Sequence, residues 1–162
     1  LVATERFRVR DYIFTNAAHA AYVEVDRDTG FIKVLNYWLV EDCGRVINPQ
    51  LVAEQQRGSV VHGLGDALYE HCIYDDAGQL QNATMADYIV PMSAEMPDIV
   101  VEHVVTPTSK TTLGAKGAGE SGMAGVPQTI LSAVNDAIAP SGGRVAAVPV
   151  TPEDVLHALG KL

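Results

Sequence analysis

A glycine-rich segment at residues 114–122, with the sequence GAKGAGESG, holds the residues of this chain most able to do chemistry. Residues 117–122 match the pattern GxGxxG, in which backbone N–H groups can bind a phosphate. The one acidic side chain, Glu120, is a candidate general base, because its small neighbours let a bulky partner approach the carboxylate. A structural role is the third option: a solvated loop glutamate, or one that caps the helix predicted from Pro127.

The surroundings of this segment argue against a dinucleotide-binding loop. Such a loop needs a buried strand before its first glycine, a helix opening at its last, and an acid about 20 residues further on. Residues 106–116 are polar and turn-like, the next helical pattern starts only at Pro127, and Gly142 stands where the acid should be. The segment also lacks the closing Lys-Ser or Lys-Thr pair of a P-loop. A nucleotide-binding domain is therefore the weakest of the interpretations.

The strand patterns in the chain predict a sheet that begins with a hairpin. Alternating or β-branched runs occur at 12–26, 31–42, 98–105 and 144–150. The first two flank an Asp28-Thr29-Gly30 turn, which is typical of an antiparallel hairpin. Because the strands alternate irregularly with helical segments, we predict the α+β class, with the hairpin in a mixed sheet.

Three helices are predicted to pack with this sheet. Apolar residues at helical spacing run from Pro49 to Tyr74 and again over 127–139, directly after the glycine-rich segment. A short terminal helix follows Thr151, its expected N-cap. The long helix contains Gly58, Gly63 and Gly65, each of which costs about 1 kcal/mol relative to alanine. Either tight packing or the close approach of a ligand explains these glycines, and both explanations stay open.

The composition excludes several classes of function. The 162 residues carry a formal net charge of −9, from 20 acids and 11 bases, and have no basic stripe. Nucleic-acid binding is therefore not expected, because its affinity comes from clustered Lys and Arg. No apolar run is long enough to cross a bilayer. Cys43 and Cys72 lack the paired spacing of a metal site. We expect a cytoplasmic protein with no protein-ligated metal.

Five motifs, taken in order, resemble one protein family over nearly the whole chain. They are VDRDTG (25–30), DCGRVINP (42–49), QQRGSVVHGLGDALYE (55–70), DYIVP (87–91) and GAKGAGESG (114–122). The sequence is similar to the C-terminal part of the molybdopterin-binding subunit of the xanthine dehydrogenase, aldehyde oxidase and carbon monoxide dehydrogenase family. The resemblance therefore implies that residues 1–162 form a C-terminal molybdopterin-binding domain, part of a longer or split subunit.

The resemblance also implies roles for individual residues. Glu120 matches the catalytic glutamate, the general base that takes a proton from Mo–OH while a C–H or CO substrate is oxidised with water as the oxygen source. Gln55 matches a glutamine that hydrogen-bonds the molybdopterin. The backbone of Lys116, Gly117, Ala118 and Gly119 matches the segment lying against the cofactor, through N–H groups that no side chain screens. The sequence departs from the family at Glu54, where glycine is usual.

The family's cofactors and partners complete the expectation. Molybdenum is bound through molybdopterin, with the cytosine dinucleotide form as one option, and 2Fe-2S clusters and FAD belong to partner domains or subunits. The chain should turn over a small-molecule substrate only together with the remaining molybdenum-binding segment, the iron–sulfur subunit and the FAD subunit. The alternative is a module of the same fold that only holds cofactor or mediates contacts.

Overall fold

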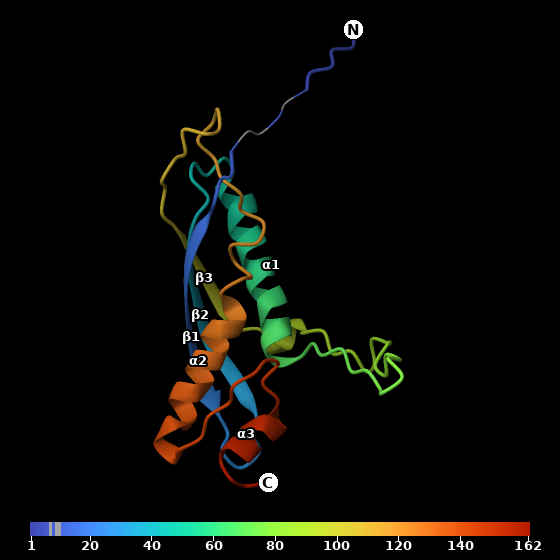
Figure 1. Ribbon diagram of the computed structural model, residues 1–162. Helices are drawn as coiled ribbons and strands as arrows, with labels where there is room; N and C mark the ends of the chain where they lie inside the picture. The colour runs from blue at the N-terminus through green and yellow to red at the C-terminus, as the bar shows by residue number, and fades with distance from the viewer. Residues whose placement is uncertain (7, 9–10) are drawn as a thin grey trace.

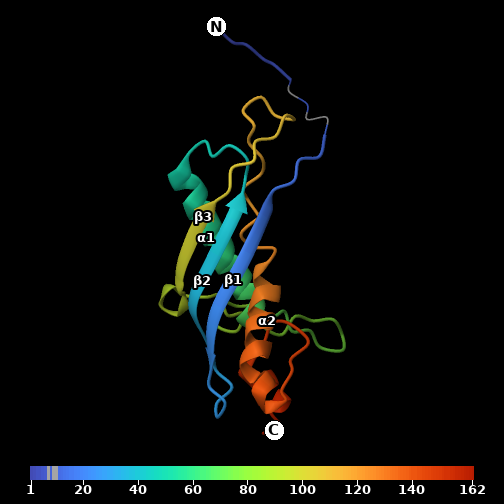
Figure 2. The ribbon, with the colours of Figure 1, turned by 90° about the vertical axis from the view of Figure 1, so that its left-hand side faces the viewer.

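The computed structural model of the chain describes residues 1–6, 8 and 11–162. Three strands form one mixed sheet in the order β1-β2-β3: β1 (Asn16–Val25), β2 (Ile32–Asp42) and β3 (Asp98–His103). β1 and β2 are antiparallel, while β2 and β3 are parallel. The predicted hairpin is therefore confirmed, with Gly30 at a φ of 77° in the turn. Figures 1 and 2 show that the strands run along the long direction of the molecule.

The helices begin where the sequence provides caps. α1 (Pro49–Leu68) starts after Asn48, whose side chain accepts from the Leu51 N–H, and α3 (Pro152–Ala158) starts after Thr151, which accepts from the Asp154 N–H. α2 (Val126–Ile138) follows the glycine-rich segment, as predicted. Short 3₁₀ turns lie at η1 (Ser93–Glu95) and η2 (Ala139–Ser141). In the described part of the chain, no helix is long and apolar enough to cross a membrane.

The core lies between one face of the sheet and the two longer helices. Period-two alternation on β2 turns Tyr37 and Leu39 inward, and both are fully buried. They belong to one apolar cluster with Leu64 of α1 and with Ile130 and Val134 of α2. Figure 2 shows the three strands in front of α1, with no helix covering their outer face. The α+β prediction is confirmed.

Some predicted boundaries were too long. α1 ends at Leu68 rather than Tyr74, because the N–H groups of Tyr69 and Glu70 both turn back to the Gly65 carbonyl. The chain then leaves the body and returns at β3, so that residues 69–92 project from the side of the molecule (Figure 1). β1 begins at Asn16 and β3 ends at His103, each shorter than predicted.

The strand predicted at 144–150 was wrong, since this segment is irregular. Asn135 of α2 takes the place of a strand partner: its side-chain amide donates to the Val145 carbonyl at 2.9 Å and accepts from the Val145 N–H at 2.8 Å. The Val150 N–H donates to the Ala67 carbonyl at the end of α1. The segment is therefore held by helices, and Val145 and Val150 are buried in the core rather than paired in the sheet.

Candidate active site

The glycine-rich segment lies along α1, which brings most of the predicted site residues together. We call residues 114–125 the Glu120 loop. Gln55 Nε2 donates to the Gly119 carbonyl at 3.0 Å, and Ser59 Oγ donates to the same carbonyl at 2.8 Å. Gln56 Nε2 donates to the Ala118 carbonyl at 2.7 Å. Three side chains of one helix therefore hold the carbonyl side of the loop.

This attachment leaves the N–H side of the loop free. Within the described residues, the N–H groups of Gly117, Ala118 and Gly119 donate to no acceptor. A Cβ added at Gly117 or Gly119 would meet nothing within 4 Å, so both residues border open space. Consecutive free N–H groups beside small residues can bind an anionic or heteroatom-rich ligand. These three residues and the Gln55 amide therefore suit a phosphate-bearing pterin.

Lys116 differs from its three neighbours. Its N–H donates to the Cys43 carbonyl at 2.7 Å, and its Nζ lies 3.0 Å from an oxygen of Asp42, with only 10% of the side chain exposed. Lys116 therefore turns toward β2 and anchors the loop, so its own N–H is not available to a ligand, and the predicted contact of its backbone with the cofactor stays a prediction. The N–H groups that face outward begin at Gly117.

Asp42, the last residue of β2, accepts the hydrogen bonds that anchor the Glu120 loop at Lys116. Its carboxylate accepts from the N–H groups of Gly44 (2.8 Å) and Thr106 (3.2 Å), and also from the Thr106 hydroxyl and Lys116. Burial by itself raises the pKa of the Asp42 carboxyl, but the Gly44 N–H and Lys116 outweigh burial and lower it. Asp42 is therefore ionised at neutral pH and holds the loop by charge-assisted hydrogen bonds.

Close approach of the backbones explains two glycines near this anchor. Gly44 has a φ of 70°, and a Cβ there would lie 2.3 Å from the Gly114 carbonyl oxygen. At Gly122 a Cβ would lie 2.6 Å from Gln56 Oε1. Larger residues at either position would push the Glu120 loop away from β2 or from α1.

Cys43 contributes its backbone rather than its thiol. The residue is 3% exposed, and burial together with the neighbouring Glu41 raises the pKa of the thiol to about 11. A protonated thiol is a poor nucleophile and a poor metal ligand. The Cys43 carbonyl, by contrast, accepts from Lys116 and so joins β2 to the loop.

Glu120 lies in an exposed turn at the entrance to α2. Its carbonyl accepts from the N–H groups of Met123 (3.1 Å) and Ala124 (3.3 Å). Its side chain borders a recess of about 420 Å³, whose other lining residues are Thr15, Asn16, Ala17, His19, Ser121, Ala124 and Gly125. Among the described residues no side-chain donor holds the carboxylate, so it is free to accept a proton from a ligand in this recess.

Several residues of the site were missed from sequence. Gln56 is fully buried, and its Oε1 accepts from Ser121 Oγ at 3.1 Å, yet a glutamine in a helix has the pattern of a surface residue. Ser59 and His19 were missed as well: nothing in the 55–70 motif assigns a role to Ser59, and His19 lies in none of the five motifs. Gln55 and Gln56 precede Ser59 by four and three residues, which places the three side chains close together on one side of α1. This spacing alone does not predict that the Glu120 loop lies against them.

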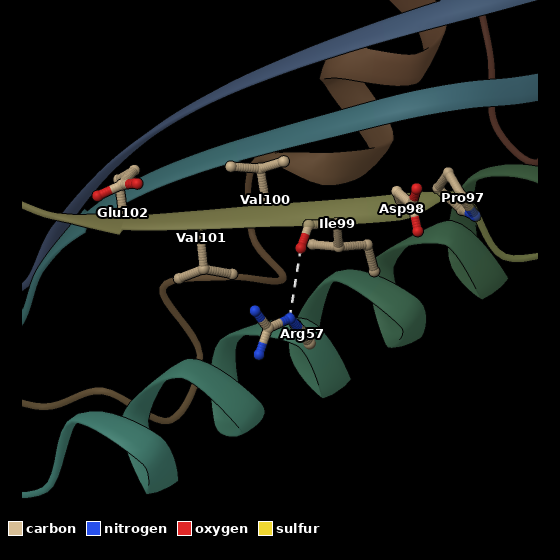
Figure 3. A pocket seen from close by; sticks show the side chains of 7 residues that line it. All are labelled: Arg57, Pro97, Asp98, Ile99, Val100, Val101 and Glu102. Carbon is tan, nitrogen blue, oxygen red and sulfur yellow. Dashed lines mark hydrogen bonds between the residues drawn. The ribbon is translucent and has the colours of Figure 1, made fainter.

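Glu54 and Arg57 do not contribute to this face of the loop. Glu54 pairs with Arg57 at 2.5 Å, and its side chain is 63% exposed. Arg57 also reaches β3, where its Nε donates to the Ile99 carbonyl at 3.3 Å, as Figure 3 shows. A hollow of about 640 Å³ borders this arginine and the edge of β3, and none of the predicted site residues lines it. The acid that departs from the family pattern is therefore engaged beside the site.

Comparisons with known proteins give the context for this geometry. A family model described as a molybdopterin cofactor-binding domain matches residues 2–97. The nicotine 6-hydroxylase large subunit of Paenarthrobacter nicotinovorans is 44% identical over 146 residues, which are 90% of this chain and 18% of the relative. The carbon monoxide dehydrogenase large chain of Hydrogenophaga pseudoflava is 32% identical over 88% of this chain and 18% of the relative.

Solved structures agree with this assignment. Quinoline 2-oxidoreductase from Pseudomonas putida 86 superposes with a TM-score of 0.87 at 41% identity, over 91% of this chain and 19% of that one. The chain thus spans about a fifth of the proteins it matches. The family model covers more than half of the chain, and the free N–H groups of the Glu120 loop suit the cofactor for which the model is named. The chain therefore belongs to the molybdopterin cofactor-binding domain family of the molybdenum hydroxylases.

Proposed function

We propose that residues 1–162 form a C-terminal part of the molybdenum-binding subunit of a hydroxylase, with Glu120 as general base. One observation carries the proposal: the carbonyls of Ala118 and Gly119 accept from α1, while the N–H groups of residues 117–119 stay free directly beside Glu120 and its recess. The outward N–H groups and the Gln55 amide would hold the pterin and its phosphate. The next residue along the chain then carries the carboxylate that faces the substrate.

The reaction needs a proton acceptor where Glu120 lies. Hydroxylation of a C–H bond with water follows R–H + H₂O → R–OH + 2H⁺ + 2e⁻. The bound molybdenum cofactor would supply the electron acceptor and the activated oxygen derived from water. Glu120 would remove the proton from that oxygen, and a positioned general base contributes about 10²- to 10⁴-fold to such a step. The hydrogen bonds from Gln55, Gln56 and Ser59 fix the loop and so limit the movement of the carboxylate.

The recess gives a first indication of the substrate. Among the described residues, its lining has no Lys or Arg side chain, so this part of the chain offers no cation to an anionic substrate there. Two of the most similar proteins are named for nicotine and quinoline, in which an aromatic ring nitrogen makes the adjacent carbon electron-poor. Others are named for carbon monoxide, aldehydes and hypoxanthine. We propose neutral N-heteroaromatic compounds as the first substrates to test.

The two electrons released must leave the site through other carriers. Relatives are named as subunits of a dehydrogenase complex or as the large chain of an enzyme, which supports assembly with further chains. We propose that the partners are the remaining molybdenum-binding segment, a 2Fe-2S subunit and an FAD subunit, with molybdopterin in the cytosine dinucleotide form as one option.

Glu120→Gln in the assembled enzyme tests the proposal. We expect molybdenum content to stay near the wild-type value while kcat for quinoline or nicotine falls by about 10²-fold or more, because the amide cannot accept the proton. The matched control is Glu153→Gln at the start of α3, where the side chain is 75% exposed. Wild-type turnover in Glu120→Gln, with molybdenum retained, would instead favour a module that only holds the cofactor.

A further inference from the structure

His19 of β1 is the residue that joins the sheet to the turn carrying Glu120. Its Nε2 lies 3.2 Å from the carbonyl oxygen of Ser121, the residue after Glu120. Its ring also packs against Gly125, where an added Cβ would lie 2.6 Å from His19 Cδ2. His19 therefore contacts both ends of the turn from Ser121 to Gly125, while it also lines the recess that Glu120 borders.

The partner on the other side of the ring determines its tautomer. Tyr37 of β2 is fully buried, and burial raises the pKa of its hydroxyl, so the phenol keeps its proton and can donate. Its hydroxyl oxygen lies 2.9 Å from His19 Nδ1, and donation from the phenol to this nitrogen is the direction that leaves Nε2 a hydrogen for the Ser121 carbonyl, which can only accept. With Nδ1 accepting, the hydrogen of the neutral ring stands on Nε2, where it donates to the Ser121 carbonyl. The two rings meet edge to face, at 74° between their planes.

The surroundings favour the neutral ring. Burial lowers the pKa of His19, although the hydrogen bond to Ser121 acts in the opposite direction. The one carboxylate that lines the same recess is Glu120, which is exposed to solvent. Toward the core, Thr129 of α2 lies next to the Tyr37 hydroxyl, and the Thr129 hydroxyl donates to the Gly125 carbonyl at 2.8 Å. The chain from Tyr37 through His19 to Ser121 therefore has each donor matched to an acceptor.

We propose that His19 is a positioning residue for Glu120: as a neutral Nε2–H imidazole, oriented by Tyr37, it binds the Ser121 carbonyl and fixes the direction of the Glu120 carboxylate. The inference rests on the proposed role of Glu120 as general base. Gln55 and Ser59 hold the loop before Glu120, whereas His19 holds it after. Without His19 the Ser121 carbonyl would lose its side-chain donor, and only the Ser121 hydroxyl, which donates to Gln56 Oε1 at 3.1 Å, would still hold this residue.

The consequence for catalysis follows from geometry. The Ser121 carbonyl is one peptide unit from Glu120, so release of this carbonyl lets the carboxylate swing within the recess. A displacement of about 1 Å can cost about 10²-fold in rate while substrate binding is retained. A positioning role therefore predicts a loss in kcat with KM nearly unchanged.

The test compares His19→Asn with His19→Gln in the full-length subunit assembled with its partners. The glutamine amide can place a donor near the position of imidazole Nε2, whereas the shorter asparagine cannot reach Ser121. We expect His19→Asn to lower kcat for quinoline or nicotine by about 10²-fold with KM and molybdenum content unchanged. His19→Gln should stay within about threefold of the wild type, since the hydrogen bond to the Ser121 carbonyl is retained.

A second readout does not depend on turnover. Amide hydrogen exchange of Met123 and Ala124, whose N–H groups bond to the Glu120 carbonyl, reports on the order of the turn. We expect about tenfold faster exchange in His19→Asn and wild-type exchange in His19→Gln, because one lost hydrogen bond corresponds to about tenfold in the open population. Wild-type exchange in His19→Asn, or equal damage in both variants, would overturn the proposal.

A double variant separates this inference from the proposed function. If His19 acts through Glu120, then adding His19→Asn to Glu120→Gln should change the remaining kcat by less than about threefold, because the group to be positioned is already gone. A full further loss would contradict the positioning role while leaving Glu120 as the base. Wild-type turnover in Glu120→Gln alone would contradict the proposed function, and the exchange data would still decide whether His19 orders the turn.

Discussion

The ion pair between Asp42 and Lys116 shows how two residues outside the proposed ligand contacts hold the Glu120 loop against β2. Only 10% of the Lys116 side chain and 11% of the Asp42 side chain are exposed. Breaking a pair of this kind leaves one charge in a poorly hydrated place, which costs more than the loss of a surface pair. The pair lies just before Gly117, where the free N–H groups begin. We therefore expect the N–H groups of residues 117–119 to keep their arrangement only while this ion pair is intact.

Asp42→Asn is expected to release the loop at Lys116. Loss of a charge-assisted hydrogen bond costs about 1.5–3 kcal/mol, which raises the open population by at least about tenfold. Trypsin cleavage after Lys116 in the assembled enzyme measures this population when reclosing is fast. The control is Asp28→Asn, which removes the exposed pair with Lys161 and should leave cleavage after Lys116 unchanged. Equal cleavage rates in Asp42→Asn and the wild type would mean that Lys116 does not anchor the loop.

At the scale of elements, local signals were sufficient for most of the fold. The hairpin follows from alternation around Asp28 and Gly30, and α3 follows from Thr151 and Pro152, since each pattern lies within one short stretch of sequence. The parallel pairing of β3 with β2 and the loss of the strand at 144–150 both depend on distant partners. Asn135 is an example: nothing in its neighbours predicts that its side chain will bind Val145.

The residues of the candidate site also fall into two groups, those that a sequence motif identifies and those whose role depends on distant contacts. A motif marks Glu120 and Gln55, because their types and order resemble a family over a long stretch. No motif assigns a role to Gln56, Ser59 or His19, and each acquires its role from a carbonyl more than 50 residues away, as in the 62-residue separation of Gln56 and Ala118. Such contacts arise from the packing of α1 and β1 against the Glu120 loop, which the sequence alone does not display.

The surroundings of the glycines in α1 separate the two explanations left open by the sequence, which were tight packing and the close approach of a ligand. A Cβ at Gly63 would lie 2.5 Å from Val126 Cβ, so this glycine allows α1 and α2 to pack closely. A Cβ at Gly65 would instead lie 2.1 Å from Oε1 of the Glu70 side chain, so this glycine makes room for a side chain beyond the end of α1 and not for another helix. A Cβ at Gly58, one turn from Gln55, would meet nothing within 4 Å. Tight packing therefore explains two of the glycines, and Gly58 borders open space near the predicted cofactor.

Gly63→Ala and Gly58→Ala form a matched pair of predictions. Gly63→Ala should lower the free energy of unfolding by about 1–3 kcal/mol, as expected for an extra methyl group in a packed helix contact. Gly58→Ala should lose none, and the helix itself gains about 1 kcal/mol from the change. Thermal unfolding of the assembled subunit measures both. An equal loss of stability in the two variants would contradict the assignment of Gly63 to packing and Gly58 to open space.

At the scale of the whole molecule, no helix of the described residues covers the outer face of the sheet (Figure 2), and the exposed residues at the centre of this face are apolar. Trp38 lies between Ala20 and Val100 in the register of the three strands, and it is 41% exposed. Tyr22, 61% exposed, continues the face along β1. A contiguous apolar face of this kind marks a contact surface. Since the chain spans about a fifth of its relatives, we infer that the remaining molybdenum-binding segment covers it.

Trp38→Lys in the full-length subunit tests that inference. A large aromatic residue at the centre of an interface contributes about 2 kcal/mol or more, so a lysine there should lower the yield of assembled complex by at least about tenfold. Phe31→Lys is the matched control, because Phe31 is 67% exposed at the tip of the hairpin, away from this face. Size-exclusion chromatography of the purified subunits measures the assembled fraction. If both variants assemble like the wild type, the outer face of the sheet is not the contact with the remaining segment.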